Sequence, residues 1–285
     1  MLRRLAIGIL VLAALALISA RVPGDARRTS ALGSFGRGGT IVLVHGLGSS
    51  GESWLPVARD LARDHRVVLV ELPGHGIAEM PGRLSLEDAA LALDRAIAAE
   101  CDGPVVLVGH SVGGLVAAEE ALRSPGRVRA LVLVETALRS PFSGAERVAL
   151  LAALERDYRG TLRENYVGFG RDSAQGLALY EEAARVDSSV MKAWIRLALT
   201  ADLSREAGAL RVPVLAVFAA RTWPEGESWS ACADTLGYSA IRGVTPARVS
   251  GAGHFVMLDR PARLAQLVRR FELGAAPEAL AALVP

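Results

Sequence analysis

Residues 105–115 read VVLVGHSVGGL, and this stretch decides the fold. Its aliphatic start is typical of a buried β-strand, and the alanine-containing residues 113–123 that follow are typical of a helix. Ser111 stands at the turn between them, flanked by Gly109 and Gly113 in the pattern G-x-S-x-G. Such a turn leaves no room for side chains at the two glycine positions, and it exposes the serine hydroxyl. The stretch therefore predicts a nucleophilic serine between a central strand and a helix.

Strands and helices are expected to alternate on both sides of this turn. The candidate strands are short and rich in β-branched residues, and they lie at 40–44, 67–72, 105–108, 131–134, 214–218 and 247–249. The candidate helices have apolar residues at helical spacing, and they lie at 53–64, 86–99, 113–123 and 261–271. This alternation predicts an α/β fold, a mostly parallel sheet of about six to seven strands covered by helices on both faces.

Residues 137–210 interrupt the alternation. This interval contains no strand-like run, and its helical stretches at 146–158 and 176–199 carry aromatic residues. An insertion between two strands of such a sheet can lie over the carboxyl edge, where these folds bind ligands. We therefore expect a helical cap at 137–210.

The composition excludes some classes of function. The chain has 285 residues, of which 51% are hydrophobic, and this is enough to bury the core of one large domain. Lysine and arginine number 32 against 30 acidic residues, so there is no basic field of the kind that binds nucleic acid. Cys101 and Cys232 are too few for a disulfide framework or a metal site, and whether they pair stays open.

The N-terminus has the pattern of an export or anchoring signal. Residues 1–4 are short and basic, and residues 5–20 follow without a charged side chain. We therefore expect a signal peptide or an N-terminal membrane anchor at 1–20, a linker at 21–39 and a folded domain at 40–285. Because the positive charges precede the apolar run, the protein is expected to be membrane-anchored or secreted, with its domain outside a bacterial-type cytoplasm.

Further motifs follow one another in order along the chain. HGLG at 45–48 comes after the first candidate strand, ELPGHG lies at 71–76, and GAGHF at 251–255 is followed by DRP at 259–261. Together with G-x-S-x-G, these motifs resemble the α/β-hydrolase family over roughly residues 40–271. The resemblance implies the α/β-hydrolase fold and a hydrolytic activity at the serine.

The resemblance also implies the parts of an active site. Ser111 would be the nucleophile, and the backbone N–H groups of Leu47 and Val112 would form an oxyanion hole. A serine hydroxyl is a poor nucleophile at neutral pH, so an imidazole must take its proton during attack and return it to the leaving group. We expect His254 to be this base. The other histidines at strand ends are implied to be structural or oxyanion-loop groups, and they are His45, His75 and His110.

The acid that orients the base is harder to assign. Most members of the family carry an aspartate after the strand expected at 214–218, but Thr222 stands there in this chain. A hydroxyl cannot stabilise an imidazolium as a carboxylate does, so another acid should serve. Glu135 ends the strand after the helix of the nucleophile, the position from which haloalkane dehalogenases and some lipases of this fold supply their acid. It is the first candidate, and the alternatives are Glu225, Glu227 and Asp234.

The sequence thus predicts a serine hydrolase that cleaves a carboxylic ester, or a related acyl bond, through an acyl-enzyme. The expected substrate is a small molecule with an apolar acyl group, because the insertion is apolar and aromatic. The expected chemistry needs no metal and no organic cofactor. Acyl transfer, cofactor-free perhydrolysis and C–C bond hydrolysis would use the same site. A hypothesis of another class, motivated by Thr222, is a binding protein that has lost its activity.

Overall fold

The computed structural model describes residues 30–274. The signal peptide or anchor expected at 1–20 lies outside these residues, as does the first part of the expected linker, 21–29. Within residues 30–274, no helix has both the length and the apolar character needed to cross a membrane.

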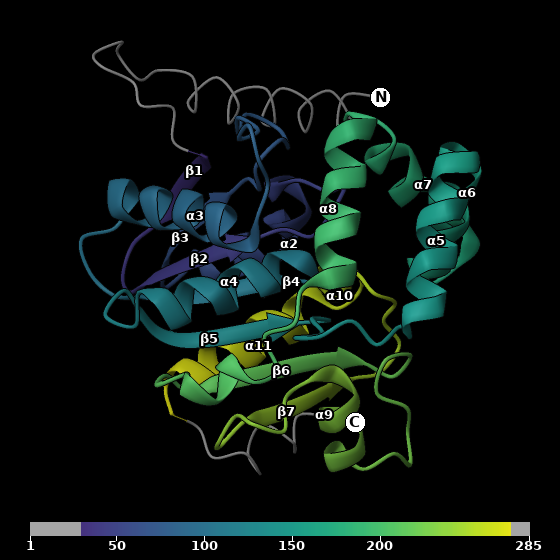
Figure 1. Ribbon diagram of the computed structural model, residues 1–285. Helices are drawn as coiled ribbons and strands as arrows, with labels where there is room; N and C mark the ends of the chain where they lie inside the picture. The colour runs from purple at the N-terminus through teal and green to yellow at the C-terminus, as the bar shows by residue number, and fades with distance from the viewer. Residues whose placement is uncertain (1–29, 275–285) are drawn as a thin grey trace, which may run out of the picture.

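The core of the described chain is a sheet of seven strands in the order β1-β3-β2-β4-β5-β6-β7 (Figure 1). Only β1 runs antiparallel to its neighbour, β3, and every other pair is parallel. The strands are β1 (Ala31–Gly36), β2 (Thr40–Val44), β3 (Arg66–Val70), β4 (Val105–His110), β5 (Val128–Val134), β6 (Val214–Ala219) and β7 (Thr245–Val249). The prediction of a mostly parallel sheet of six to seven strands is confirmed.

Strand β1 corrects the prediction of a linker over 21–39. Its sequence, ALGSFG, contains two glycines and has no continuous apolar run, so it does not read as a strand. It lies at the edge of the sheet, and its register on β3 shifts between Ala31 and Gly33. An edge strand needs to bury only part of its surface, and Leu32 and Phe35 pack on the core while the remaining side chains stay partly exposed.

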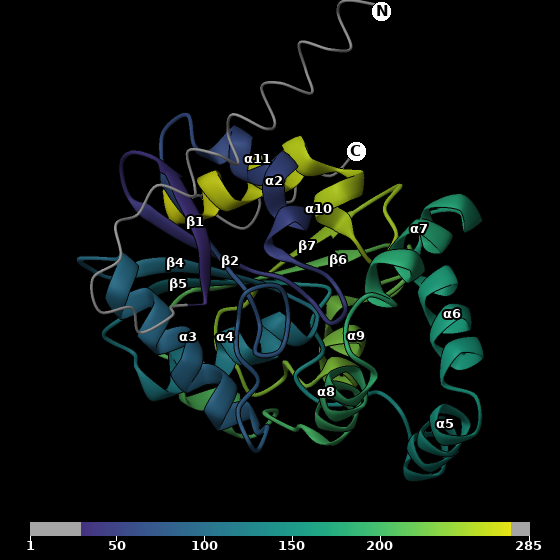
Figure 2. The same ribbon diagram turned by 90° about the horizontal axis from the view of Figure 1, so that it is seen from above.

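Helices cover both faces of the sheet (Figure 2). On β2, Val42 and Val44 face one layer of helices while Ile41 and Leu43 face the other, as the two-residue period of a strand requires. The first layer consists of α3 (Leu86–Glu100), α4 (Val112–Arg123) and α9 (Trp229–Leu236). The second consists of α2 (Leu55–Leu61), α10 (Val256–Asp259) and α11 (Pro261–Glu272). Two short 3-10 helices, η1 (Gly51–Trp54) and η2 (Glu206–Ala209), precede α2 and β6.

Four helices follow one another between β5 and β6, and we call them the cap. They are α5 (Gly144–Arg156), α6 (Tyr158–Phe169), α7 (Ser173–Ala183) and α8 (Ser188–Thr200). In Figure 1, α5, α6 and α7 lie to the right of the sheet, and α8 stands above its right-hand end. Each begins with a side chain that accepts a hydrogen bond from a backbone N–H of the first turn, and these N-caps are Ser143, Asp157, Asp172 and Asp187.

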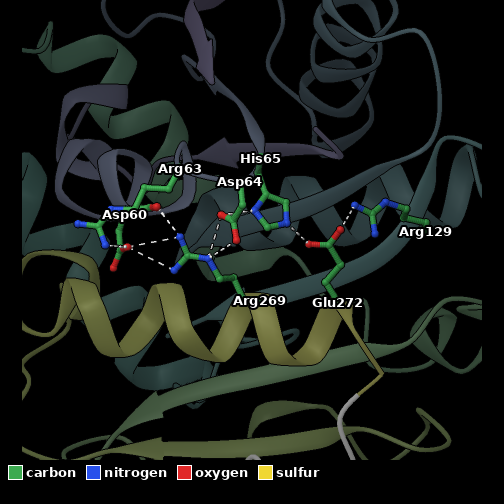
Figure 3. Close-up of polar contacts among 7 residues, drawn as sticks. All are labelled: Asp60, Arg63, Asp64, His65, Arg129, Arg269 and Glu272. Carbon is green, nitrogen blue, oxygen red and sulfur yellow. Dashed lines mark hydrogen bonds and ion pairs between the residues drawn. The ribbon is translucent and has the colours of Figure 1, made fainter. Parts of the chain in front are cut away.

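A network of charged side chains joins α11 to the end of α2 and the start of β5 (Figure 3). Its members are Asp60, Arg63, Asp64, His65, Arg129, Arg269 and Glu272. Arg269 Nε lies 3.0 Å from both carboxylate oxygens of Asp64, and His65 Nε2 lies 2.6 Å from Glu272 Oε2. The network therefore holds α11 against the rest of the domain.

The two cysteines of the described chain, Cys101 and Cys232, are both free thiols.

Candidate active site

Ser111 lies at the turn between β4 and α4 with φ at 52°. This left-handed backbone is disfavoured for a residue with a Cβ, so the surrounding structure must hold it there. A Cβ at Gly109 would lie 2.5 Å from Gly114 Cα, and one at Gly113 would collide with the carbonyl oxygen of His45. The glycines of the motif thus allow α4 to pack directly on β2 and β4, and the turn directs Ser111 into a pocket.

Glu135 has the same unusual backbone, with φ at 50° directly after β5. Ser111 and Glu135 are the two residues other than glycine with positive φ between residues 30 and 274. The Glu135 side chain is almost fully buried. Its Oε1 accepts a hydrogen bond of 2.7 Å from Ala219 N, and its Oε2 accepts one of 2.8 Å from Thr222 Oγ1. The carboxylate is therefore held at the carboxyl end of β6 and faces the loop of His254.

His254 contacts Glu135 through one ring nitrogen. Its Nδ1 lies 2.9 Å from Glu135 Oε2, so Nε2 is the ring nitrogen that remains for a reacting hydroxyl. The loop is held by a hydrogen bond of 2.9 Å from His254 N to Phe169 O, and the Phe169 ring lies 4.7 Å from the imidazole between centroids. His254 and Ser111 line the same pocket.

The other acids considered from the sequence lie elsewhere. Neither Glu225, Glu227 nor Asp234 forms a hydrogen bond or an ion pair with His254 in the part of the chain that the structure describes. Glu225 is exposed, and the contacts of Glu227 run through its backbone carbonyl to Trp223 and Arg248. Of the four candidates, Glu135 is thus the one that the structure brings to the histidine.

Leu47 and Val112 both line the pocket beside Ser111. Val112 is the first residue of α4, so its N–H has no acceptor within the helix and forms part of the positive end of the helix dipole. Leu47 lies in the loop after β2, and its carbonyl accepts a hydrogen bond of 2.7 Å from Tyr166 Oη. Both residues therefore border the pocket that Ser111 lines, as an oxyanion role for their N–H groups would require.

Buried side chains of the motifs brace the loop of Leu47. Gly48 N donates to His75 Nε2 at 3.1 Å, Gly51 N donates to Glu71 Oε1 at 3.1 Å, and Glu71 Oε2 lies 2.9 Å from His45 Nε2. Burial lowers the pKa of His75 to about 4, and the nearby His45 adds to the shift, so His75 is a neutral acceptor at neutral pH. Burial alone would raise the pKa of Glu71, but the hydrogen bond and the charge of His45 lower it overall.

His110, like His75, is a buried histidine that contacts a backbone group of a loop at the site. It is almost fully buried, and its Nε2 lies 2.9 Å from the carbonyl oxygen of His254. Burial, together with the charge of His254, holds the pKa of His110 well below its usual range. The structure thus gives His45, His75 and His110 bracing contacts, in line with the structural roles that the family resemblance implies.

The pocket has a volume of about 350 Å³ and lies between the cap and the carboxyl edge of the sheet. Its lining is mostly apolar, and the cap supplies Leu150, Leu154, Leu162, Tyr166, Phe169, Ile195, Ala198 and Leu199. Arg139 and Arg221 also line it. A pocket of this kind accommodates an apolar group next to a few polar atoms.

Sequence reasoning missed the parts that Thr222, Tyr166 and Phe169 play. Thr222 was noted only as a missing acid, although a hydroxyl at that position can donate to a carboxylate on the neighbouring strand. Tyr166 and Phe169 touch the loops of Leu47 and His254 only through the tertiary structure. Both residues fall between the helical stretches expected at 146–158 and 176–199, so their aromatic character within the apolar insertion was the one available signal.

Comparison with known proteins gives the following similarities. The family described as "Alpha/beta hydrolase family" matches residues 41–267. Polyketide synthase ThaQ of Burkholderia thailandensis is 31% identical over 278 residues, covering 90% of this chain and 13% of the synthase. The pimeloyl-[acyl-carrier protein] methyl ester esterase of Cronobacter sakazakii is 34% identical over 155 residues, covering 53% of this chain and 57% of the esterase. The chain thus spans less than two thirds of the length of these curated relatives.

Among solved structures, a hydrolase from Oleispira antarctica is similar to this chain with a TM-score of 0.73. The two share 16% sequence identity, and the similarity covers 83% of this chain and 93% of the hydrolase. At a sequence identity of 16%, the structural similarity is evidence for a shared fold alone.

The comparisons contradict the location that the sequence led us to expect. Several curated relatives are named as esterases of a methyl ester on acyl-carrier protein, and not as exported or membrane-anchored proteins. The expectation rested on the basic residues 1–4 and the apolar residues 5–20, which lie outside the described part of the chain. The prediction of a membrane-anchored or secreted protein with an extracytoplasmic domain is therefore wrong.

Proposed function

Since this chain belongs to the α/β-hydrolase family, we propose that it hydrolyses carboxylic esters with Ser111 as nucleophile, His254 as general base and Glu135 as the acid that supports the base. One observation carries the proposal. His254 Nδ1 lies 2.9 Å from Glu135 Oε2 in the pocket that also holds Ser111. Nucleophile, base and carboxylate in this arrangement define the chemistry of serine hydrolases.

The first half of the reaction forms an acyl-enzyme. Ser111 Oγ attacks the ester carbonyl carbon while His254 Nε2 takes the hydroxyl proton. The negative charge that develops on the carbonyl oxygen is stabilised by the N–H groups of Leu47 and Val112. The C–O bond to the alcohol then breaks, and the alcohol leaves with the proton held by His254.

The second half releases the acid. A water molecule gives a proton to His254 Nε2 and attacks the acyl carbon, and the same two N–H groups stabilise the new oxyanion. The bond to Ser111 Oγ breaks, and the serine recovers its proton from His254. Throughout, Glu135 keeps Nδ1 protonated and stabilises the imidazolium, while the donors Ala219 N and Thr222 Oγ1 hold the carboxylate in place.

The pocket supports a substrate class. Its apolar lining and its volume of about 350 Å³ suit an uncharged acyl chain of modest length. The relatives named for a methyl ester suggest that the alcohol side is small. We propose esters of short to medium apolar acyl groups with small alcohols as substrates.

Hydrolysis of p-nitrophenyl esters across acyl lengths tests the proposal. The parent should turn over the shorter esters, and Ser111→Ala should lose this activity. Ser230→Ala is the matched control, because Ser230 is exposed and lies outside the pocket. Equal activity in Ser111→Ala and the parent would contradict the proposal, as would the absence of turnover by the parent on every ester.

A further inference from the structure

The last turn of α6 contacts both catalytic loops. Tyr166 donates its hydroxyl hydrogen to Leu47 O at 2.7 Å, and Phe169 O accepts from His254 N at 2.9 Å. Residues three apart lie on the same face of a helix, and the two rings contact each other with centroids 5.5 Å apart. One helical turn of the cap therefore joins the loop of the oxyanion donor to the loop of the base.

Glycines allow this close approach on both sides. A Cβ at Gly48, where φ is 65°, would collide with Tyr166 Oη. A Cβ at Gly253 would lie 2.7 Å from Phe169 O. Neither loop has room to shift against α6, so the helix and the two loops pack as one unit.

The peptide between Leu47 and Gly48 is held at both of its polar atoms. Its carbonyl accepts from Tyr166, and its N–H donates to His75. Burial raises the pKa of the Tyr166 phenol far above its usual value, so the hydroxyl is a permanent donor at neutral pH. This peptide directly follows the one that carries the Leu47 N–H, so holding both of its polar atoms restrains the position of Leu47.

A second contact secures the histidine loop to the same corner of the cap. Asp259 is buried, and its Oδ2 accepts a hydrogen bond of 2.8 Å from Gly253 N. Its Oδ1 accepts hydrogen bonds from Gln175 Nε2 at 2.6 Å and from Arg171 at 3.1 Å, both beside or on α7. Through Asp259, side chains at the junction of α6 and α7 thus restrain Gly253, the residue before His254.

We propose that the last turn of α6 is a positioning element of the catalytic machinery, in which Tyr166 sets the oxyanion donor of Leu47 and Phe169 sets His254. The proposal rests on the proposed function. Its consequence is that this corner of the cap stays on the catalytic loops during turnover and is not a lid over them. The Tyr166 hydroxyl, which is bonded to Leu47 O, then contributes to stabilisation of the transition state, whereas the ring lines the pocket.

Tyr166→Phe tests this, with Tyr158→Phe as the matched control. Tyr158 lies on the same helix, and its buried hydroxyl has no hydrogen-bond partner among the described residues. An oxyanion donor that is lost outright costs about 10²- to 10³-fold in kcat, so a donor that is merely loosened should cost roughly three- to tenfold. We expect kcat of Tyr166→Phe to fall by that amount with KM unchanged, and Tyr158→Phe to match the parent.

The decisive readout is the affinity for a trifluoromethyl ketone, which forms a tetrahedral oxyanion on the serine. Its Kd should rise in Tyr166→Phe in parallel with the fall in kcat, whereas a general loss of stability would lower Tm without this change. Equal kcat and equal Kd in the two variants, or an effect on KM alone, would overturn the positioning role. A parent that hydrolyses no ester and binds no trifluoromethyl ketone would instead overturn the proposed function, and the inference with it.

Discussion

Thr222 donates its hydroxyl hydrogen to the Glu135 oxygen that also contacts Nδ1 of His254. The residue that stands where the family usually has its acid thus contacts the carboxylate that reaches the histidine from the neighbouring strand. Glu135 directly follows β5, which pairs with β6, and Thr222 lies in the loop after β6. The hypothesis of a decayed site was motivated by Thr222, and this contact gives Thr222 a partner in the candidate acid.

Removal of the Thr222 hydroxyl should weaken the hydrogen bonding that holds the Glu135 carboxylate against His254. In Thr222→Val the carboxylate keeps Ala219 N and His254 as partners but loses one neutral hydrogen bond. Such a bond is worth about 0.5–1.5 kcal/mol, so kcat should fall roughly two- to tenfold. Steady-state kinetics measure this, and Thr222→Ser, which keeps the hydroxyl, should retain most of the activity. Unchanged kcat in Thr222→Val would show that the hydroxyl has no influence on the base.

Loss of the Glu135 charge should be far more severe. Glu135→Gln keeps the size of the side chain but cannot stabilise an imidazolium, and an amide in this role lowers kcat by on the order of 10³- to 10⁴-fold. Adding Thr222→Asp to this variant restores a carboxylate at the position usual in the family, so part of the activity should return. In the parent, Thr222→Asp should lower activity, because two carboxylates would then compete for one histidine. A gain of activity by Thr222→Asp in the parent would contradict the assignment of Glu135.

Stability should fall as the pH drops from about 6.5 towards 4. The pKa of His75 is about 4 in the folded chain and near 6.5 in an unfolded one, so the unfolded state binds more protons between these values. His75 therefore contributes stability that is present above pH 6.5 and is lost as the pH falls, by on the order of 3 kcal/mol at pH 4. Urea unfolding at pH 7 and pH 4.5 should show a smaller pH dependence for His75→Gln than for the parent. The same dependence in both proteins would refute this.

The network of Figure 3 should stabilise α11 without affecting catalysis. Arg269 contacts Asp60 and Asp64 and is mostly buried, whereas Arg63 is 80% exposed and, among residues 30–274, forms an ion pair with Asp60 alone. Arg269→Met should lower the free energy of unfolding by about 1 kcal/mol, and Arg63→Met should change it by less than about 0.5 kcal/mol. Denaturant unfolding measures the difference, which should shrink at high salt. A lowered kcat in Arg269→Met would show that the network reaches the site.

Local patterns explain how much of this could be predicted from the sequence. The aliphatic run before Ser111 and the glycines around it specify a strand, a strained turn and a helix, and the sheet follows from the repetition of that pattern. Strand β1 was missed because an edge strand with two glycines lacks an apolar run. The contact of Glu135 with His254 joins residues that are 119 positions apart, so the sequence could offer Glu135 only as one candidate among four.

The contacts of the cap could not be predicted from the sequence either, because they also join residues that are far apart along the chain. Tyr166 and Phe169 were recognisable as aromatic residues of the insertion at 137–210, but their partners lie in loops that only the folded sheet brings together. The direction in which a helix approaches a sheet depends on packing, and no local propensity encodes it.

Labelling by a fluorophosphonate, located by peptide mass spectrometry, tests the central claim most directly. The reagent reacts only with a serine whose proton is removed by a base, so the parent should carry one label on Ser111. Labelling should be lost in Ser111→Ala and strongly slowed in Glu135→Gln. A parent that stays unlabelled, or a label at another residue, would contradict the account of Ser111, His254 and Glu135 as one catalytic unit.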